Sequence, residues 1–183
     1  MARPREFDRT RALQCAMLTF WECGGYDQTS VSQLTEAMGI SSPSLYAAFG
    51  SKRDLFDEAV ELYAQRPGTP LTLALTEPTA YEFASRLLDA AIVDCTKRSQ
   101  PKGCLVNTDP LLVDRRDSGR AVIAKRLARA VDEGDLPTSA DPKTLAEYLI
   151  IVVNGLSARA RDGVTRRELQ AVATNVMAAW PRT

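Results

Sequence analysis

Apolar residues return every three or four positions along nearly the whole chain, and no stretch sustains the alternation typical of a strand. This spacing predicts an all-α protein with about nine helices. Residues 67–78 carry three prolines and are interpreted as an irregular connection. The predicted helices lie between Asp8 and Gly24, at residues 31–38, 42–49, 51–63 and 79–97, near Cys104, and at residues 119–133, 142–161 and 166–180.

Signals for helix ends support this division. Thr79 with Glu82, and Thr165 with Glu168, have the spacing of a capping box, in which two side chains close the first turn of a helix. Gly39 is the expected stop of the helix at residues 31–38, because glycine adopts the left-handed conformation that a sharp turn requires.

The short helices at residues 31–38 and 42–49 are joined by a tight turn that contains Gly39, an arrangement typical of a helix-turn-helix motif. Apolar side chains seat the pair on the first helix, and small or polar side chains remain on the outer side of the second helix. These outer residues are Ser42, Pro43, Ser44, Tyr46 and Ala47. A helix with such a surface can enter the major groove of DNA. The same spacing also occurs in helical pairs that have no role in DNA binding.

Composition adds limits to this picture. The chain has 183 residues, of which 45% are hydrophobic and 25% charged, so it is long enough to bury a core. Its 23 basic and 23 acidic residues balance, and any DNA-binding face must therefore be a local concentration of positive charge. The absence of histidine excludes catalytic triads and metal sites that depend on histidine.

Motifs for catalysis are missing, and we expect no catalytic residues, no metal site and no cofactor. The segment from Ser99 to Lys102 matches the SxxK pattern of acyl-transfer enzymes, but the partner motifs of those enzymes do not occur. The four cysteines form no CxxC pair. No signal peptide is visible, and the longest apolar run, Leu149 to Val153, is too short to span a bilayer. A cytoplasmic protein with reduced thiols is expected, with no membrane contact.

The segment from Thr29 to Lys52 resembles the DNA-binding motif of the TetR family of bacterial transcriptional regulators, most clearly in Leu45-Tyr46-x-x-Phe49-x-Ser51-Lys52. The helix layout of the remaining chain is similar to that family. The resemblance implies a helix-turn-helix DNA-binding domain at residues 1–50 and an effector-binding and dimerisation domain at residues 51–183. It further implies a repressor that binds a palindromic double-stranded operator as a homodimer and is released by a small-molecule effector.

The resemblance also implies DNA contacts. Tyr46 and Lys52 would contact phosphates, and Thr29 and Ser30 would offer hydroxyl and amide donors to the DNA backbone. Base reading would fall to Ser42, Pro43, Ser44 and Ala47. No Arg, Asn or Gln stands among these residues for a bidentate contact, so modest discrimination by each half-site is expected.

Two further features bear on DNA binding. Arg5 belongs to an arginine-rich N-terminal arm that could enter a narrow minor groove, and a tail of ordinary charge is the alternative. Ala47 stands where many family members have histidine or an aromatic residue, which removes one customary contact. Thr35 stands where a small alanine is usual, and we expect its hydroxyl to bond the carbonyl four residues back.

The two apolar C-terminal helices, at residues 142–161 and 166–180, are the predicted dimer interface, because helix-turn-helix proteins lengthen their DNA site by pairing. In the TetR family these helices form a four-helix bundle with those of the partner. The predicted interface residues are Leu145, Leu149, Val152, Leu156, Leu169, Val172, Val176 and Trp180. The alternative is that these side chains are buried within the monomer.

The middle helices are predicted to enclose an effector pocket. Its predicted lining residues are Phe56, Tyr63, Phe83, Leu87, Cys104 and Tyr148, each of which also fits an ordinary core. Residues 97–129 hold nine basic residues against three acidic ones, which indicates either a solvated helix face or a preference for anionic effectors. The helix after Asp117 is shorter than is usual in the family, which bears on the size of the pocket.

Cys104 suggests an alternative function. It lies at the predicted start of a helix and two residues after Lys102, and both features favour a thiolate. A regulator that senses oxidants or electrophiles through this thiol is therefore the alternative to a ligand-released repressor. The plainer interpretation is a small buried hydrophobe, as for Cys15, Cys23 and Cys95.

Overall fold

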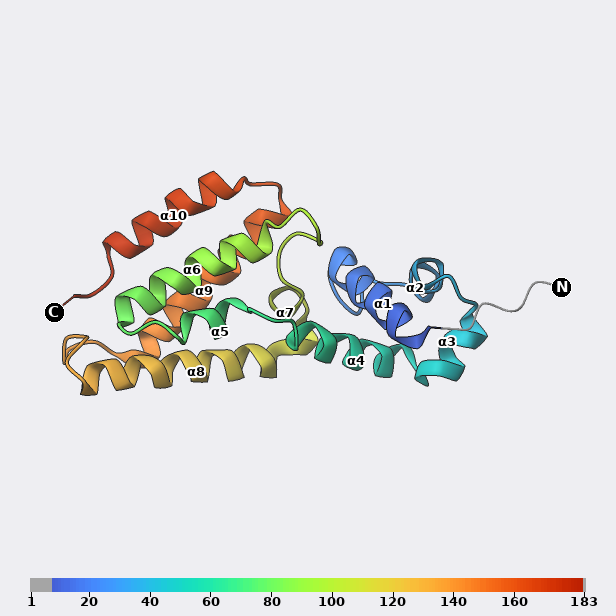
Figure 1. Cartoon of the computed structure of the whole chain (residues 1–183), viewed down its shortest axis with the longest axis horizontal. Helices are drawn as coiled ribbons and strands as arrows, with labels where there is room; N and C mark the ends of the chain where they lie inside the picture. Colours follow the sequence, from blue (N-terminus) through green and yellow to red (C-terminus); the bar gives the residue numbers. More distant parts are fainter. Residues whose placement is uncertain (1–7, 183) are drawn as a thin grey trace. The chain divides into compact units, whose positions relative to one another are not determined.

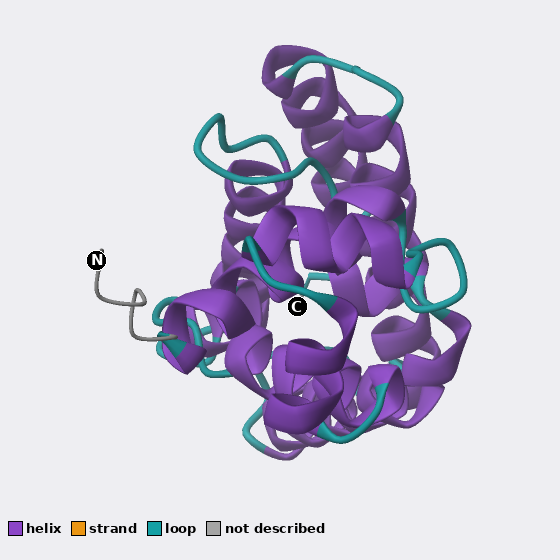
Figure 2. Ribbon diagram, turned by 90° about the vertical axis from the view of Figure 1, so that its right-hand side faces the viewer, coloured by secondary structure: helices purple, strands orange, loops and turns teal. Residues whose placement is uncertain are grey.

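A computed structural model describes residues 8–182, and over that range it contains helices and loops but no strand (Figure 2). The predicted all-α fold is thereby confirmed. The helices are α1 (Arg9–Cys23), α2 (Val31–Met38), α3 (Ser42–Phe49), α4 (Lys52–Ala64), α5 (Pro70–Ala74), α6 (Ala80–Cys95), α7 (Leu105–Thr108), a 3-10 turn (Pro110–Leu112), α8 (Val113–Asp132), α9 (Pro142–Arg161) and α10 (Arg166–Ala178).

Two elements differ from the predicted layout. Helix α5 forms within the segment interpreted as irregular, because Pro70 occupies its first turn, where a missing N–H costs nothing. Helix α8 begins at Val113 rather than at residue 119 and runs for 20 residues, so it is not the short helix that was expected. The 3-10 turn before it is closed by Asp109, whose carboxylate accepts from the Leu111 N–H at 2.8 Å.

Helix ends follow the capping signals of the sequence. Thr79 opens α6 and Thr165 opens α10, and each completes a capping box with the glutamate three residues later. Gly39 ends α2 at φ 66° and ψ 35°, in the left-handed region. The local sequence therefore accounts for where these helices begin and end.

The described chain divides into two compact units, one ending at Arg66 and the other beginning at Pro67, whereas the predicted domain boundary lies after residue 50. Helix α4 packs on α1 and completes the N-terminal unit (Figure 1). Edge-to-face ring pairs fasten the two helices: Phe20 meets Phe56 at 5.0 Å between ring centroids, and Trp21 meets Tyr63 at 4.9 Å. These buried aromatics make α4 part of the core of that unit.

The C-terminal unit is built around α6, which packs against α5, α9 and α10 (Figure 1). Helix α8 packs mainly on α9. Apolar side chains from all these helices form one continuous core, whose members include Phe83 and Leu88 of α6, Leu127 of α8 and Leu149 of α9. Within residues 8–182, every helix is too short or too polar to cross a membrane.

Candidate nucleic-acid interface

Helices α2 and α3 are joined by Gly39-Ile40-Ser41, as the sequence indicated. The Ile40 N–H returns to the Thr35 carbonyl at 3.1 Å, which closes the end of α2. The Thr35 hydroxyl donates to the Val31 carbonyl at 3.0 Å, and this confirms the predicted bond to the residue four positions back. Ser41 then opens α3 with its side chain accepting from the Ser44 N–H at 3.3 Å.

Helix α3 has one buried and one exposed side. Leu45 is 0% exposed and Phe49 is 4% exposed, and both anchor the helix in the core of the N-terminal unit. The residues on the other side are exposed, and they are Ser42, Pro43, Ser44, Tyr46 and Ala47. Tyr46 is 47% exposed, so its ring and hydroxyl are accessible to a partner. The Ser44 hydroxyl lies 2.8 Å from the Ser41 hydroxyl.

Residues predicted to contact phosphates have different surroundings. Ser30 is exposed and caps α2, with its hydroxyl accepting from the Gln33 N–H at 3.2 Å. Thr29 is only 1% exposed, and its hydroxyl donates to the Gly25 carbonyl at 2.6 Å. The prediction that the Thr29 hydroxyl faces DNA is therefore wrong, because this hydroxyl bonds the loop before α2 from inside the unit.

Lys52 is held in place by Tyr26, a residue that the sequence did not single out. The Lys52 ammonium donates to the Tyr26 carbonyl at 2.7 Å and lies 4.1 Å from the centroid of the Tyr26 ring. An ammonium group has three donors, so this one hydrogen bond leaves capacity for a phosphate. The contact orients the cation at the N-terminus of α4, whose helix dipole also favours an anion.

The N-terminal arginines divide between the described and undescribed parts of the chain. Arg5 lies outside the described residues. Arg9 belongs to α1, where it pairs with Glu58 at 2.6 Å, donates to the Ala48 carbonyl at 3.3 Å and stacks over the Phe49 ring at 4.5 Å. Arg9 therefore fastens the end of α3 to α1 and α4, a role that its place in a basic run did not indicate.

The residues of the predicted effector pocket are divided between the two units. Phe56 and Tyr63 are buried in the N-terminal unit, whereas Phe83 and Leu87 are buried in the core of the C-terminal unit. Tyr148 is 36% exposed on α9. Cys104 is half-buried before α7. Helical spacing identified these residues as apolar, and the pocket that they were predicted to share stays a prediction.

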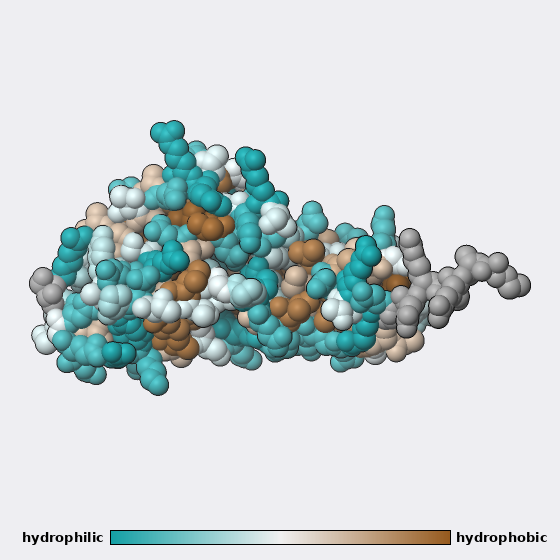
Figure 3. Space-filling view, viewed as in Figure 1, coloured by the Kyte–Doolittle hydropathy of each residue, from teal (hydrophilic) through white to brown (hydrophobic). Residues whose placement is uncertain are grey.

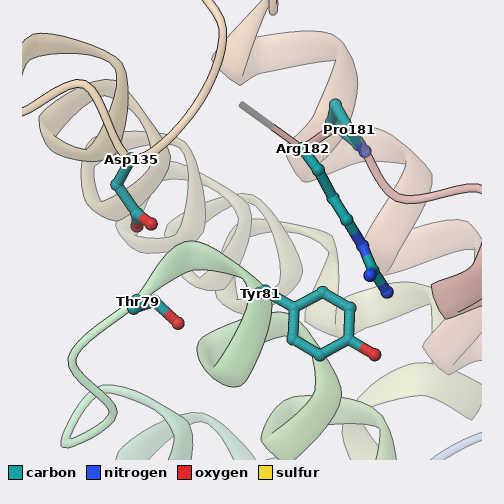
Figure 4. A pocket seen from close by; sticks show the side chains of 5 residues that line it. All are labelled: Thr79, Tyr81, Asp135, Pro181 and Arg182. Carbon is teal, nitrogen blue, oxygen red and sulfur yellow. The ribbon is translucent and has the colours of Figure 1, made fainter.

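The structure instead has cavities elsewhere. One of about 600 Å³ lies beside the start of α3, and its lining includes Arg11, Glu36, Ser41 and Ser44. Another of about 300 Å³ is lined by Thr79, Tyr81, Asp135, Pro181 and Arg182 (Figure 4). There the Arg182 guanidinium lies over the Tyr81 ring at 4.6 Å. A third cavity lies between the α5–α6 loop and α8. None of these three is lined by the predicted effector residues.

The predicted dimer residues separate into two groups. Leu149, Leu156, Leu169 and Trp180 are at most 3% exposed and belong to the core of their own unit, so their assignment to the interface is wrong. Val172 is 49% exposed, and Leu145, Val152 and Val176 are half-buried. Helix α9 is apolar on both sides, and sequence spacing did not distinguish its inner stripe from its outer one.

The outer stripe of α9 also includes Tyr148 and Ile151. Tyr148 is 36% exposed and Ile151 is 61% exposed, the largest exposed fraction among the exposed large hydrophobic residues of the described chain. On the face drawn in Figure 3, apolar residues also reach the surface as patches bordered by hydrophilic ones. Exposed apolar stripes of this kind mark surfaces that a partner covers.

A helix pair with an outward second helix, carried by a separate helical unit, defines a helix-turn-helix regulator. The family model described as "Bacterial regulatory proteins, tetR family" matches residues 18–66, which end at the boundary of the N-terminal unit. The chain is 32% identical to the HTH-type transcriptional repressor ComR of Escherichia coli K12, over 98% of this chain and 91% of ComR. The repressor BdcR of the same organism is 30% identical over 93% of this chain and 88% of BdcR. The chain therefore belongs to the TetR family, as predicted.

Solved structures agree with this assignment. The TetR family transcriptional regulator CifR, a cysteine mutant complexed with 26-base-pair double-strand operator DNA, is 38% identical with a TM-score of 0.89. The match covers 98% of this chain and 100% of the CifR chain. A TetR regulator from Chloroflexus aurantiacus has the same fold at 22% identity, with a TM-score of 0.79 over 95% of this chain and 96% of that one.

Proposed function

We propose that the chain is a repressor that binds a palindromic DNA operator as a homodimer and leaves it when a small-molecule effector binds. The observation that carries the proposal is the outward face of α3, where Tyr46 and its small neighbours are exposed while Leu45 and Phe49 anchor the helix. ComR and BdcR are named as repressors, and CifR was solved on its operator.

Contacts to phosphates set the position of the protein on DNA. The Tyr46 hydroxyl, the Lys52 ammonium and the exposed cap at Ser30 are suited to this role. Their contribution is independent of base sequence, and for Lys52 it depends on salt through release of counterions. Tyr26 restrains Lys52, so less side-chain entropy is lost on binding.

Base reading falls to the exposed residues of α3. Serine hydroxyls can bond several base edges, whereas Pro43 and Ala47 pack only on the methyl group of thymine. The bond between the Ser44 and Ser41 hydroxyls leaves Ser44 able to donate or accept in turn. Modest discrimination by each half-site makes a second subunit necessary for a specific site.

The second subunit is expected on the outer stripe of α9 and on α10. TetR family regulators act as dimers, and Tyr148, Ile151 and Val172 provide exposed apolar area in this chain. Covering such area stabilises a dimer by about 25 cal/mol for each Å² removed from water. A two-fold axis through this surface repeats α3 once, and the DNA site then repeats as a palindrome.

Effector release requires a ligand that binds the two conformations of the dimer with different affinity. We place the effector site in the C-terminal unit, residues 67–183, because the N-terminal unit is occupied by the DNA-binding motif and its core. The predicted lining residues are divided between the two units, so we consider the two cavities of the C-terminal unit as candidate effector sites.

The decisive experiment is DNA binding by a variant of the α3 face. Ala47→Glu places a carboxylate on the exposed side of α3, and we expect affinity for a duplex from the upstream region of the gene to fall by about a hundredfold or more. Ala64→Glu, on the exposed end of α4 in the same unit, is the matched control. Fluorescence anisotropy measures both. Equal affinity in the two variants would remove α3 from the interface.

Thiol sensing through Cys104 is the second candidate function. Burial, with smaller contributions from Asp94 and Cys104, raises the pKa of the Cys95 thiol to about 11, so this thiol stays protonated near neutral pH. The Lys102 ammonium donates to the Thr96 carbonyl at 2.6 Å and to the Lys97 carbonyl at 3.2 Å. CifR was solved as a cysteine mutant, and the similarly folded NemR was solved in a reduced form. Cysteines were therefore of interest in both of these proteins.

The test for this function compares operator release by the unmodified chain and by Cys104→Ser under mild peroxide or a quinone. Thiol sensing predicts release of the unmodified chain alone, because the thiolate is the nucleophile that such reagents meet. Equal release in both would dismiss Cys104 as the sensor.

A further inference from the structure

A cavity of about 460 Å³ lies between the loop that joins α5 to α6 and the middle of α8. This volume is within the range of small-molecule sites, roughly 300–1,000 Å³. Leu75 and Val122 line it and are each 41% exposed, so the cavity is open to solvent. Its lining residues are Leu75, Thr76, Glu77, Pro78, Val122, Lys125, Arg126 and Arg129.

Arg126 gives the cavity a charge that no carboxylate of the described residues neutralises. Its Nη2 donates to the Pro78 carbonyl at 2.9 Å and to the Glu77 carbonyl at 3.3 Å, and both acceptors are uncharged backbone groups. Its Nη1 is buried and has no hydrogen-bond partner among the described residues. The guanidinium carbon lies 5.6 Å from the centroid of the Phe83 ring. A partly desolvated cation of this kind attracts an anion more strongly than an exposed one does.

The other charged residues of the cavity leave a positive excess. Lys125 is exposed and makes no hydrogen bond or ion pair with the residues that the structure describes. Arg129 pairs with Glu133 at 2.8 Å, and the Glu77 carboxylate lies 3.8 Å from Arg86. After this pairing, Lys125 and Arg126 remain as two uncompensated cations at consecutive positions of α8.

The remaining walls are apolar. Leu75 and Pro78 come from the loop, and Val122 lies one turn before Arg126 on α8. A purely inorganic anion would meet the cations but leave these walls in water, and a neutral apolar compound would leave the cations unmatched. We propose that this cavity binds organic anions that combine an apolar body with a carboxylate. The inference concerns ligand binding and stands independently of the DNA-binding function.

Calorimetry on the full chain tests the proposal with defined probes. Octanoate and benzoate supply both features, 1-octanol and benzyl alcohol supply only the apolar body, and inorganic phosphate supplies only the charge. We expect at least one carboxylate to bind about tenfold or more tightly than its alcohol and than phosphate, and to weaken as salt is added. Failure of both carboxylates to bind, or binding of phosphate as tight as theirs, would overturn the proposal.

Variants locate the binding. Lys125→Gln removes an exposed charge, and affinity for the carboxylate is expected to fall about threefold to fivefold, the range of exposed ion pairs. Val122→Asp places a like charge on the apolar wall and is expected to abolish binding. Lys143→Gln, an exposed lysine on another 20-residue helix, is the matched control and should bind as the unmodified chain does.

All three substituted side chains are exposed, so the variants should melt at the same temperature as the unmodified chain without ligand. Carboxylate binding that is equal in Lys125→Gln, Val122→Asp and Lys143→Gln would place it elsewhere and contradict the proposal. Operator binding, measured in parallel, is decided separately: a chain that binds DNA but no carboxylate loses only this inference.

Discussion

Helices α3 and α9 both present side chains to solvent, but their outer faces differ in chemistry. The face of α3 carries small or polar side chains apart from Tyr46, and that of α9 has the large side chains of Tyr148 and Ile151. Water solvates the first face at little cost, so it can remain uncovered until a polar partner arrives. The second face is stabilised by being covered, since burial of an aliphatic side chain contributes about 1.5–3 kcal/mol. This difference in chemistry supports our proposal that α3 binds DNA transiently and that α9 is covered permanently by a second subunit.

The largest expected effect comes from breaking the apolar face. Ile151→Glu would place a charge in the centre of the proposed interface on both subunits, and we expect a monomer and a loss of operator affinity of about a hundredfold or more. Sedimentation equilibrium and anisotropy measure the two quantities. Ala121→Glu, on the exposed side of α8, should leave the dimer intact. A dimeric Ile151→Glu variant would show that the outer stripe of α9 is not the dimer interface.

Lys52→Ala should have the next largest effect, on all DNA sequences alike. Affinity is expected to fall about tenfold, and the slope of log affinity against log salt to decrease by about one, because one phosphate contact is lost. Tyr46→Phe should weaken binding without a comparable change in slope, since its hydroxyl carries no charge. Titrations at several salt concentrations measure both. Unchanged affinity of Lys52→Ala at every salt concentration would refute the phosphate contact.

A matched pair of glycine substitutions tests the turn at Gly39, which orients α3 relative to α2. Gly39→Ala forces an alanine to φ +66° and should destabilise the fold by about 1–2 kcal/mol, although nothing lies within 4 Å of the new Cβ. Gly119→Ala, inside α8 and equally unobstructed, should stabilise by about 0.5–1 kcal/mol. Urea unfolding measures both, and effects of the same sign would contradict the turn geometry.

Ser44→Ala is expected to have the smallest effect and the most specific one. Total affinity should change by only about threefold, while the base preferred opposite α3 should change, because a hydroxyl that reads base edges is replaced by a methyl group. Selection from randomised duplexes reads the preference. Ser118→Ala, exposed on α8, is the control. The same selected motif for both variants would exclude Ser44 from base reading.

Much of the helical fold followed from local chemistry. The capping boxes at Thr79 and Thr165 and the stop at Gly39 lie where the sequence indicated. The outward residues of α3 were also correct, because a short helix with two anchors, Leu45 and Phe49, has only one possible exposed side. Local signals suffice when one helix packs through one face.

Contacts between residues far apart in the sequence were harder to predict. Thr29 has the residue type of a DNA contact, but a carbonyl of the preceding loop accepts its hydrogen bond inside the unit. Tyr26 was missed because its role depends on an ammonium that is 26 positions away along the chain. The cavity beside Arg126 escaped notice for a similar reason: its other wall comes from residues nearly fifty positions earlier.

The order of apolar and polar residues was enough to predict an all-helical chain and its helix-turn-helix segment, and the residues from Thr29 to Lys52 resembled a known family. Each of these depends on contacts between residues a few positions apart. Which side of α9 turns inward, where the first unit ends and which side chains share a cavity were settled by three-dimensional packing. An apolar residue gains similar free energy against any apolar neighbour, so spacing alone does not reveal which neighbour it meets.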